Sequence, residues 1–537
     1  MAQFDSPAGQ RLALQAPLAV AAGLAQAASL AWPWSGEALW WLQLVSMAVL
    51  AWLVRPHAHQ AVGWRRGALM GGLFATAWLA GTFWWLFISL HTYGGLAAPL
   101  AVAAVLGLAA FLGSYYAAVL GLFCHLAPAS KALTALLFGA LWLLAELARG
   151  TLWTGFPWGA GGYAHVDGPL VALARYGGVY GIGAVAAVLA MYGVQLRGAD
   201  LGRWRTWVLA LVVVTAGLSP QLLCACSSTV LSRVPPMTLE LLQGNIPQDE
   251  KFQQGSGVPV ALQWYAQALR DAKADLVVAP ETAIPLLPQQ LMPGYLEGLQ
   301  SRYAQGSQAA LLGIPMGDEA LGYSNSVLAL SPANSGEPYR YDKHHLVPFG
   351  EFIPPFFKWF TAMMDIPLGD FNRGAVGQAS FAWAGQRIAP NICYEDLFGE
   401  ELGARFADPA QAPTVFVNFS NIGWFGNTIA IDQHLHISRM RALEFERPMV
   451  RATNTGATAI IDHRGVVTHQ LERHTRGVLK GEVHGRGLDA QNGWAITPYA
   501  WWVSRWGLWP LWSLAGLTLL VALWVKVNQR GGTGRYP

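Results

Sequence analysis

Long apolar runs dominate the first half of the chain and return once near its end. Because a bilayer core of about 30 Å requires about 20 apolar residues in a helix, each run predicts a membrane-spanning helix. The seven early runs are centred near residues 22, 46, 79, 110, 140, 183 and 215, and the eighth covers residues 507 to 525. The first run has no clear cleavage site after it, so we interpret it as a helix of the mature protein.

Between the seventh and eighth runs the pattern changes to short β-rich runs separated by polar or helical segments. The runs at 238–243, 275–279, 310–314, 326–330, 388–392 and 414–419 are typical of strands. The sequence therefore predicts seven transmembrane helices in residues 1–232 and a globular α/β domain in residues 233–490. A linker, the eighth transmembrane helix and a tail are predicted in residues 491–537.

Lys and Arg residues in the short loops predict the orientation of the helices, because cationic loops are retained on the cytoplasmic side. They fall at alternate loops or termini of an eight-span chain: Arg11, Arg55, Arg65, Arg66, Lys131, Arg197, Arg203, Arg205, Lys526, Arg530 and Arg535. Arg149 and Arg175 are exceptions in one longer connection. The pattern predicts cytoplasmic termini and a globular domain on the outer face.

The amino-acid composition and net charge of the chain exclude one class of function, nucleic-acid binding. Of the 537 residues, 53% are hydrophobic and 12% are charged, and the net charge is only +3. Nucleic-acid surfaces need clustered Lys and Arg, so nucleic-acid binding is excluded.

The cysteines at 124, 224, 226 and 393 show neither a CxxC pair nor zinc-ligand spacing. Cys224 and Cys226 could form a strained local disulfide or be two small residues at a helix end, and the sequence leaves their oxidation state open.

Three segments that follow predicted strands carry residues suited to chemistry at a carbonyl group. Such chemistry needs a nucleophile, a base and a positive charge for the oxyanion. Cys393, Glu281 and Lys343 supply a thiol, a carboxylate and an ammonium group. Each residue alone is more often structural, so it is their combination that indicates acyl transfer or hydrolysis.

The order and local sequence of these residues resemble the Glu-Lys-Cys triad of the nitrilase superfamily. Further motifs resemble the apolipoprotein N-acyltransferase family of Gram-negative bacteria. They are Gln243-Gly-Asn-Ile-Pro-Gln248, Lys343 to Glu351, Cys393-Tyr-Glu395, Asn421-Ile-Gly-Trp-Phe-Gly426, Gln433-His-Leu-His436, Arg439-Met-Arg-Ala-Leu-Glu444, Arg447-Pro448 and Asn454-Thr-Gly456. A globular domain between seven helices and a last one also matches that family.

The resemblance implies a membrane bundle of eight spans with a nitrilase-like α-β-β-α sandwich in the periplasm, anchored in the inner membrane. It implies that a phospholipid gives an acyl chain to Cys393, forming a thioester. The chain then passes to the N-terminal amine of the diacylglyceryl-cysteine of an apolipoprotein, in the last step of lipoprotein maturation. We expect no cofactor, no metal and a monomer.

Carried over by position, Glu281 matches the base of the triad, Lys343 the oxyanion-stabilising residue and Cys393 the nucleophile. Supporting or substrate-binding roles are expected for Glu351, Tyr394, Glu395, Phe252 and Trp424. The family commonly has Lys-Trp after the Pro-Gln segment, whereas Phe252 follows Lys251 here. An apolar contact is therefore kept, but an indole N–H donor is lost.

Two other functions fit parts of the sequence. A membrane-tethered amidase or nitrilase would share the triad but would not need eight spans. A transporter or scaffold would need polar residues within the spans, and only Glu146 qualifies. The His344-His345 and His434-x-His436 pairs have no third ligand at zinc spacing, so packing near the site explains them better than a metal. Structural ion pairs are expected for Asp396, Arg439, Arg441, Glu444 and Arg447.

An aromatic segment at 352–364 has two interpretations. Its large side chains are Phe352, Phe356, Phe357, Trp359, Phe360, Met363 and Met364. Beside the Lys343–Glu351 loop it could be a lid that dips toward lipid or a buried helix of the core. The preferred acyl chain, the preferred head group and the route of substrate entry cannot be predicted from the sequence.

Overall fold

The computed structural model describes residues 7–56, 62–201, 236–332, 338–355, 370–487 and 496–532. The chain divides into two compact units. The first contains Met1–Trp84, Pro99–Cys226 and Leu508–Pro537, and the second contains Trp85–Ala98 and Ser227–Gly507. The predicted span near residue 215, with Cys224 and Cys226, lies outside the described residues.

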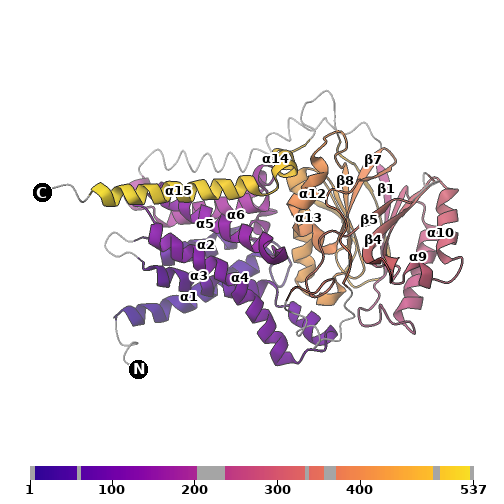
Figure 1. Cartoon of the computed structure of the whole chain (residues 1–537), viewed down its shortest axis with the longest axis horizontal. Coiled ribbons are helices and arrows are strands. Elements are labelled where there is room, and N and C mark those ends of the chain that lie inside the picture. The colour runs from indigo at the N-terminus through magenta and orange to yellow at the C-terminus, as the bar shows by residue number, and fades with distance from the viewer. Residues whose placement is uncertain are drawn as a thin grey trace. The chain divides into compact units, whose positions relative to one another are not determined.

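Long apolar helices build the first unit (Figure 1). They are α1 (Pro7–Leu30), α2 (Trp40–Val54), α3 (Trp64–Thr82), α4 (Ala98–Leu126), α5 (Lys131–Thr151), α6 (Ala174–Val194) and α15 (Trp509–Gly532). Short helices η2 (Leu152–Thr154), η3 (Gly161–His165), η4 (Pro169–Leu173) and α7 (Gly198–Leu201) follow α5 or α6 or lie between them. Among the described residues, the four helical stretches at 98–126, 131–154, 169–194 and 509–528 are long and apolar enough to cross a membrane. The predicted number of eight spans therefore stays a prediction.

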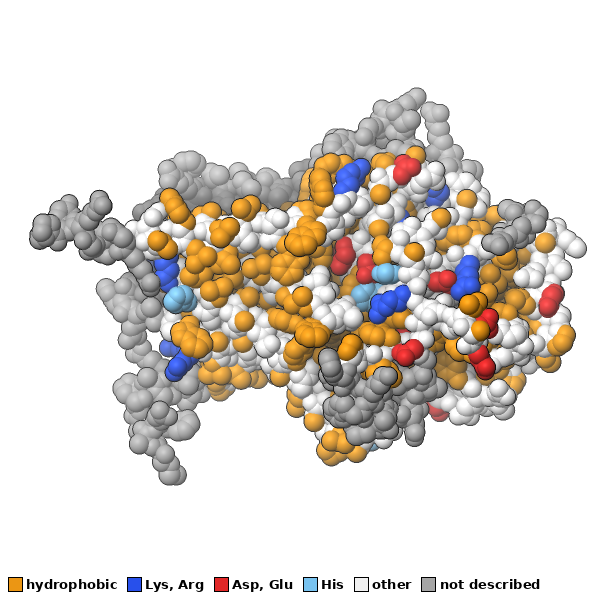
Figure 2. All heavy atoms as spheres, in the orientation of Figure 1, with side chains coloured by type: hydrophobic (Ala, Val, Ile, Leu, Met, Phe, Trp, Pro, Cys, Tyr) orange, Lys and Arg blue, Asp and Glu red, His pale blue; other side chains and the backbone are white. Residues whose placement is uncertain are grey.

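The surface of these helices is largely apolar. Large hydrophobic side chains such as Leu106, Phe111 and Leu517 are exposed. On the face shown in Figure 2, hydrophobic side chains cover the helices of this unit, while Lys and Arg gather at one end of them. Exposed apolar surface of this extent is typical of a protein whose helices face lipid.

The charged pair within α5 is fully buried and fixes the chain that follows this helix. Arg149 Nη2 lies 2.9 Å from Glu146 Oε2, and both side chains are at most 1% exposed. Arg149 Nη1 also donates to the carbonyl oxygens of Phe156 at 2.8 Å and Trp158 at 2.9 Å. Glu146 thus has a structural partner for its charge, which accounts for a carboxylate inside an apolar helix.

Two six-stranded sheets form the centre of the second unit. Their orders are β12-β1-β2-β3-β4-β5 and β11-β10-β9-β8-β7-β6. The strands are β1 (Met237–Gln243), β2 (Leu276–Ala279), β3 (Ala309–Asp318), β4 (Gly322–Leu330), β5 (Arg340–Asp342), β6 (Phe381–Trp383), β7 (Gln386–Ile392), β8 (Val415–Ser420), β9 (Met449–Thr453), β10 (Ala459–Ile461), β11 (Val467–Gln470) and β12 (Gly477–Val483). β1, β2 and β3 are parallel in the first sheet, and β7, β8 and β9 are parallel in the second. All six predicted strand runs are confirmed, as β1, β2, β3, β4, β7 and β8.

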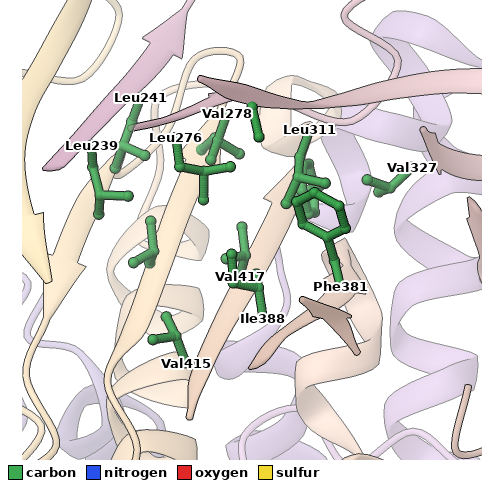
Figure 3. Close-up of a cluster of buried hydrophobic side chains, with 14 of the residues drawn as sticks. Leu239, Leu241, Leu276, Val278, Leu311, Val327, Phe381, Ile388, Val415 and Val417 are labelled. Carbon is green, nitrogen blue, oxygen red and sulfur yellow. The ribbon is translucent and has the colours of Figure 1, made fainter. Parts of the chain in front are cut away.

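Alternating apolar residues of the two sheets form the core between them (Figure 3). Leu239, Leu276 and Val278 from the first sheet cluster with Ile388 and Val417 from the second, and all are at most 1% exposed. Successive strand residues point to opposite faces, so the residues between them face the helices. Those helices and the remaining short turns are η1 (Ile88–Tyr93), α9 (Gly257–Asp271), η5 (Pro288–Gln290), α10 (Tyr295–Ala304), η6 (Cys393–Leu397), α12 (Gly399–Gly403), η7 (Ala404–Phe406), η8 (Ile422–Phe425), α13 (Ala430–Phe445) and α14 (Pro498–Trp506).

The helices of this unit lie outside the pair of sheets. Figure 1 shows α9 and α10 beside the first sheet and α12 and α13 on the opposite side of the strands. Tyr265 of α9 and Tyr303 of α10 are buried against strand residues such as Val277. The resulting layers, helix, sheet, sheet and helix, confirm the predicted α/β sandwich.

Candidate active site

The three predicted triad residues follow three different strands. Glu281 comes two residues after β2, Lys343 directly after β5 and Cys393 directly after β7, as the first residue of η6. Cys393 has a φ of 52°, a left-handed conformation that costs energy for any residue with a side chain. Active sites often hold a nucleophile in a strained backbone conformation of this kind, between a strand and a turn.

The carboxylate and the ammonium groups of the site are buried together. Lys343 Nζ lies 3.4 Å from Glu281 Oε1 and 2.9 Å from Glu351 Oε1. Asn325 Nδ2 donates to the same two oxygens, at 2.8 Å each. The backbone N–H of Asn421 donates to the other oxygen of Glu281 at 2.9 Å. The structure therefore brings Glu281, Lys343 and the predicted supporting residue Glu351 into one hydrogen-bonded cluster.

The surroundings keep the Cys393 thiol protonated and the Lys343 amine charged. Burial, together with Glu281, raises the pKa of Cys393 to about 12, although Lys343 lowers it. Burial alone would lower the pKa of Lys343, but Glu351 and Glu281 reverse this effect and raise it. Since a thiol with so high a pKa is not a thiolate at rest, it could act as a nucleophile only by losing its proton during attack, and a nearby carboxylate can accept that proton.

Glu351 and Glu395 hold the loops that carry the triad. Glu351 Oε2 accepts from the backbone N–H of Val347 at 2.8 Å, within the loop that starts at Lys343. Glu395 Oε2 accepts from the Tyr341 hydroxyl at 2.7 Å, and its Oε1 accepts from the His344 backbone at 2.6 Å. Burial raises the pKa of Glu395, while these hydrogen bonds oppose the shift. Both predicted supporting carboxylates are thus placed to fix the turns around the predicted triad.

Tyr394 lies beside the same loop. Its side chain is 4% exposed, and its ring centroid lies 5.6 Å from that of His345 and 5.3 Å from that of Phe398. The His345 ring in turn stacks on Phe398 at 3.5 Å. Its Nδ1 lies 2.8 Å from Glu401 Oε1, so packing and a carboxylate partner account for the paired histidine.

A second buried cluster supports the backbone of Cys393, and we call it the support cluster: Asp396, His434, Ser438 and Arg451. His434 Nε2 lies 3.0 Å from Asp396 Oδ1 and 3.3 Å from the Cys393 carbonyl oxygen. Asn418 Nδ2 donates to the same carbonyl at 3.1 Å. Burial would raise the pKa of Asp396, but His434 and Arg451 lower it. The expected structural role of Asp396 agrees with these contacts, although its main partners were not predicted.

The predicted ion pairs on α13 are only partly as expected. Arg441 Nη1 pairs with Glu444 Oε2 at 2.9 Å, three residues further along the helix. α13 ends at Phe445, so Arg447 lies beyond the helix and donates from Nε to the Pro413 carbonyl at 2.7 Å. The left-handed conformation of Glu446, with a φ of 49°, terminates the helix before Arg447.

The two predicted aromatic substrate-binding residues differ in exposure and partners. Phe252 is 43% exposed, as an apolar contact for an acyl chain requires. Trp424 is half-buried, and its ring centroid lies 5.7 Å from that of Tyr93 in η1. Trp85 packs on Phe425 at 4.2 Å and donates through Nε1 to Gln433 Oε1 at 3.1 Å. The loop with Trp424 therefore packs on the segment at 85–98. The two segments are far apart in the sequence, so the sequence does not predict this contact.

Much of the aromatic segment at 352–364 lies outside the described residues. Phe352 is described, and its ring lies 4.7 Å from the Arg373 guanidinium carbon. Residues 356–369, which include Phe356, Phe357, Trp359, Phe360, Met363 and Met364, are not described. The two interpretations of this segment therefore both stay predictions.

Comparison with known proteins covers nearly the whole chain. Residues 24–192 match the family described as "Apolipoprotein N-acyltransferase N-terminal domain", and residues 240–488 match "Carbon-nitrogen hydrolase". The apolipoprotein N-acyltransferase of Verminephrobacter eiseniae is 76% identical over 93% of this chain and 94% of its own length. That of Ralstonia nicotianae is 44% identical, with 97% and 98% covered.

The solved structures that match this chain include a carbon-nitrogen hydrolase from Helicobacter pylori and an amidase from Nesterenkonia. The first is 15% identical, with a TM-score of 0.34, and covers 51% of this chain and 94% of that one. The second is 16% identical, with a TM-score of 0.35, and covers 53% and 99%. The sequence relatives carry the assignment: the chain belongs to the apolipoprotein N-acyltransferase family.

Proposed function

We propose that the protein acylates lipoproteins in two steps through a thioester on Cys393, with a phospholipid as donor and the N-terminal amine of a diacylglyceryl-cysteine as acceptor. Membership of the family supports lipoprotein N-acylation. The observation that carries the chemistry is that Glu281 and Lys343 are buried and paired, and that their charges act on the thiol of the half-buried Cys393.

In the first step, Glu281 accepts the thiol proton as the Cys393 sulfur attacks the ester carbonyl of the phospholipid. The ammonium group of Lys343 stabilises the oxyanion that forms, because a fixed charge in a dry site is worth far more than in water. The ester C–O bond then breaks, and Glu281 gives the proton to the leaving lysophospholipid oxygen. In the second step, the acceptor amine attacks the thioester and the C–S bond breaks.

Hydrolysis of a small amide is the weaker candidate. An amidase could use the same three residues, but it has no need for the apolar helices of the first unit. The thioester must instead survive in the presence of water until the amine arrives, which favours a site closed by apolar groups. Phe252, Trp424 and the aromatic segment after Glu351 are suited to that role.

We propose eight membrane spans in a monomer of the inner membrane, with seven in residues 1–232, a periplasmic catalytic domain in 233–490 and the last span in 491–537. The alternating cations of the loops support this arrangement. A cysteine placed at Ser335, in a background with Cys224 and Cys226 replaced by serine, should react with a membrane-impermeant reagent in intact spheroplasts. A cysteine at Ser130, in a predicted cytoplasmic loop, is the matched control and should be protected. The reverse labelling pattern would invert the topology.

Intact-mass measurement tests the catalytic proposal directly. Purified protein incubated with phospholipid alone should gain the mass of one acyl chain, and peptide mapping should place it on Cys393. Adding a diacylglyceryl-cysteine peptide should remove the adduct and acylate the peptide. A chain without an adduct, or an adduct that water removes as fast as the peptide does, would contradict the proposal.

A further inference from the structure

A second buried lysine lies beside the triad and has no part in the mechanism described so far. Lys251 comes from the loop after β1 and is 2% exposed. Its Nζ donates to the backbone carbonyl oxygen of Glu281 at 3.1 Å. It also interacts electrostatically with Glu281 and Cys393, so its amine belongs to the same cluster as the reacting groups.

The two buried lysines differ in their partners. Lys343 is paired with the carboxylates of Glu281 and Glu351. Within the described part of the chain, Lys251 Nζ donates one hydrogen bond, to a neutral carbonyl oxygen, and lies 5.8 Å from the centroid of the Phe252 ring. A buried ammonium group has three N–H donors to satisfy, so this setting favours the neutral amine.

The charges nearest to Lys251 oppose the effect of burial on its pKa but do not outweigh it. Burial lowers the pKa of Lys251 to about 7, against the opposing effect of Glu281 and Cys393. The carboxylates on its own loop, Asp249 and Glu250, are exposed to solvent. At neutral pH a substantial fraction of Lys251 can therefore accept a proton, whereas Lys343 keeps its own.

The second step of the reaction needs such a group. A free α-amino group has a pKa of about 7.7 to 8.0, so most of the acceptor arrives as an ammonium ion. Forming the amide removes two protons from that nitrogen. One of them returns to the Cys393 sulfur, and Glu281 can carry it. The other requires a second acceptor.

We propose, on the basis of the proposed function, that Lys251 is a further catalytic residue that serves the second step as the base for the acceptor amine. The neutral Lys251 amine takes the first proton from the acceptor's ammonium group. The free amine attacks the thioester carbonyl, the C–N bond forms and the C–S bond breaks. Glu281 passes the second amine proton to the sulfur, and Lys251 then releases its proton to solvent.

Separating the two steps tests this role. The full chain is incubated with phospholipid, and the acyl adduct on Cys393 is followed by intact mass. A diacylglyceryl-cysteine peptide is then added, and decay of the adduct is timed between pH 6 and pH 9. The variants are Lys251→Met, Lys251→Gln, which keeps a donor for the Glu281 carbonyl, and Lys273→Met, an exposed lysine as the control. Met is apolar and of similar length, so the fold should tolerate the loss of a buried amine.

Both Lys251 variants should form the adduct within about threefold of the wild-type rate but transfer it about 100-fold more slowly at pH 6.5. The difference should shrink above pH 8.5, where the acceptor amine loses its proton unaided. Wild-type transfer should rise with pH through about 7. The Lys273→Met variant should match the wild type.

Three results would overturn the role of Lys251. They are full transfer by Lys251→Gln, an equal loss in both steps, and a wild-type profile that rises only near the pKa of the free amine. Failure of the wild-type protein to form any adduct is different, because it would contradict the proposed function itself.

Discussion

Two buried clusters of charged residues contact the catalytic turn, and they differ in how completely their charges are compensated. In the support cluster, Asp396 Oδ1 lies 3.0 Å from His434, and Oδ2 accepts from Ser438 and Arg451. In the catalytic cluster, two carboxylates share the single ammonium group of Lys343. A cluster whose charges are fully paired can hold a backbone in place but does not readily exchange protons. A cluster whose charges are incompletely compensated can accept or donate a proton.

Cys393 interacts with both clusters, through its carbonyl oxygen with one and through the charges that act on its thiol with the other. The Cys393 carbonyl is held by His434 and Asn418, while burial and the charge of Glu281 raise the pKa of its thiol to about 12. The backbone of Cys393, the proposed nucleophile, is thus held in place, while the thiol keeps its proton. Variants in the two clusters should accordingly fail in different ways, one in chemistry and the other in stability.

Removal of the nucleophile should have the largest effect. Cys393→Ala and Cys393→Ser should both abolish acyl transfer, because the reaction requires sulfur as the nucleophile and as a good leaving group. Both variants should keep the wild-type melting temperature, since neither disturbs the carbonyl contacts of this residue. Acylation of a diacylglyceryl-cysteine peptide, followed by mass, measures the loss. Turnover by the alanine variant would remove the basis of the proposed mechanism.

Loss of the base should come next. Glu281→Gln removes the proton acceptor from the catalytic cluster and should slow thioester formation about 100- to 10,000-fold. Glu240→Gln is the matched control, because Glu240 is also buried, at 6% exposure, but belongs to β1 away from the triad. Its rate of adduct formation should stay within about twofold of wild type. Equal rates in the two variants would show that Glu281 is not the base.

Asp396→Asn should break the support cluster, and its main effect should be a lower free energy of unfolding. Leaving Arg451 without its buried partner should cost about 3 to 5 kcal/mol of unfolding free energy. Asp432→Asn, which breaks a partly exposed pair with Arg473, should cost about 1 kcal/mol or less. Denaturant titration of the three proteins gives the comparison. Similar losses for both variants would mean that burial does not distinguish the pairs.

The buried contacts of Asp396 with His434 and Arg451 also predict how stability depends on pH in the acid range. His434 and Arg451 hold the pKa of Asp396 below its usual value, so the stabilisation is fully present above about pH 3.9, the value for the unfolded chain. It is lost as the pH falls through the lower folded pKa. Asp396→Asn cannot titrate, and its stability should therefore fall less steeply at acid pH than that of the wild type.

The parts of the site that could be predicted are those encoded locally. Glu281 and Cys393 each follow a strand whose apolar pattern is plain in the sequence, whereas Lys343 follows the short polar strand β5, which was not predicted, and is found by the motif from Lys343 to Glu351. His434 and Asp396 are 38 residues apart, and Asn421 reaches Glu281 across 140 residues. Such pairs depend on how the two sheets pack, which no local pattern specifies. In the sequence Lys251 stands out only as the neighbour of Phe252, because its burial, on which its proposed chemistry depends, is not visible there.

The smallest expected effect tests whether contacts beyond Asn421 help to orient the carboxylate of Glu281. Trp85 donates to Gln433 and packs on Phe425, and the loop that contains Phe425 begins at Asn421, whose N–H holds Glu281. Trp85→Phe keeps an aromatic ring but removes one hydrogen bond, so it should cost about 1 kcal/mol of stability. Thioester formation should slow by a few fold, because the carboxylate loses part of its orientation. Trp84→Phe is the control: Trp84 is 45% exposed, and its replacement should change stability by no more than about 0.5 kcal/mol. If Trp85→Phe lowers stability but leaves the rate of adduct formation at the wild-type value, the segment at 85–98 supports the fold without orienting the base.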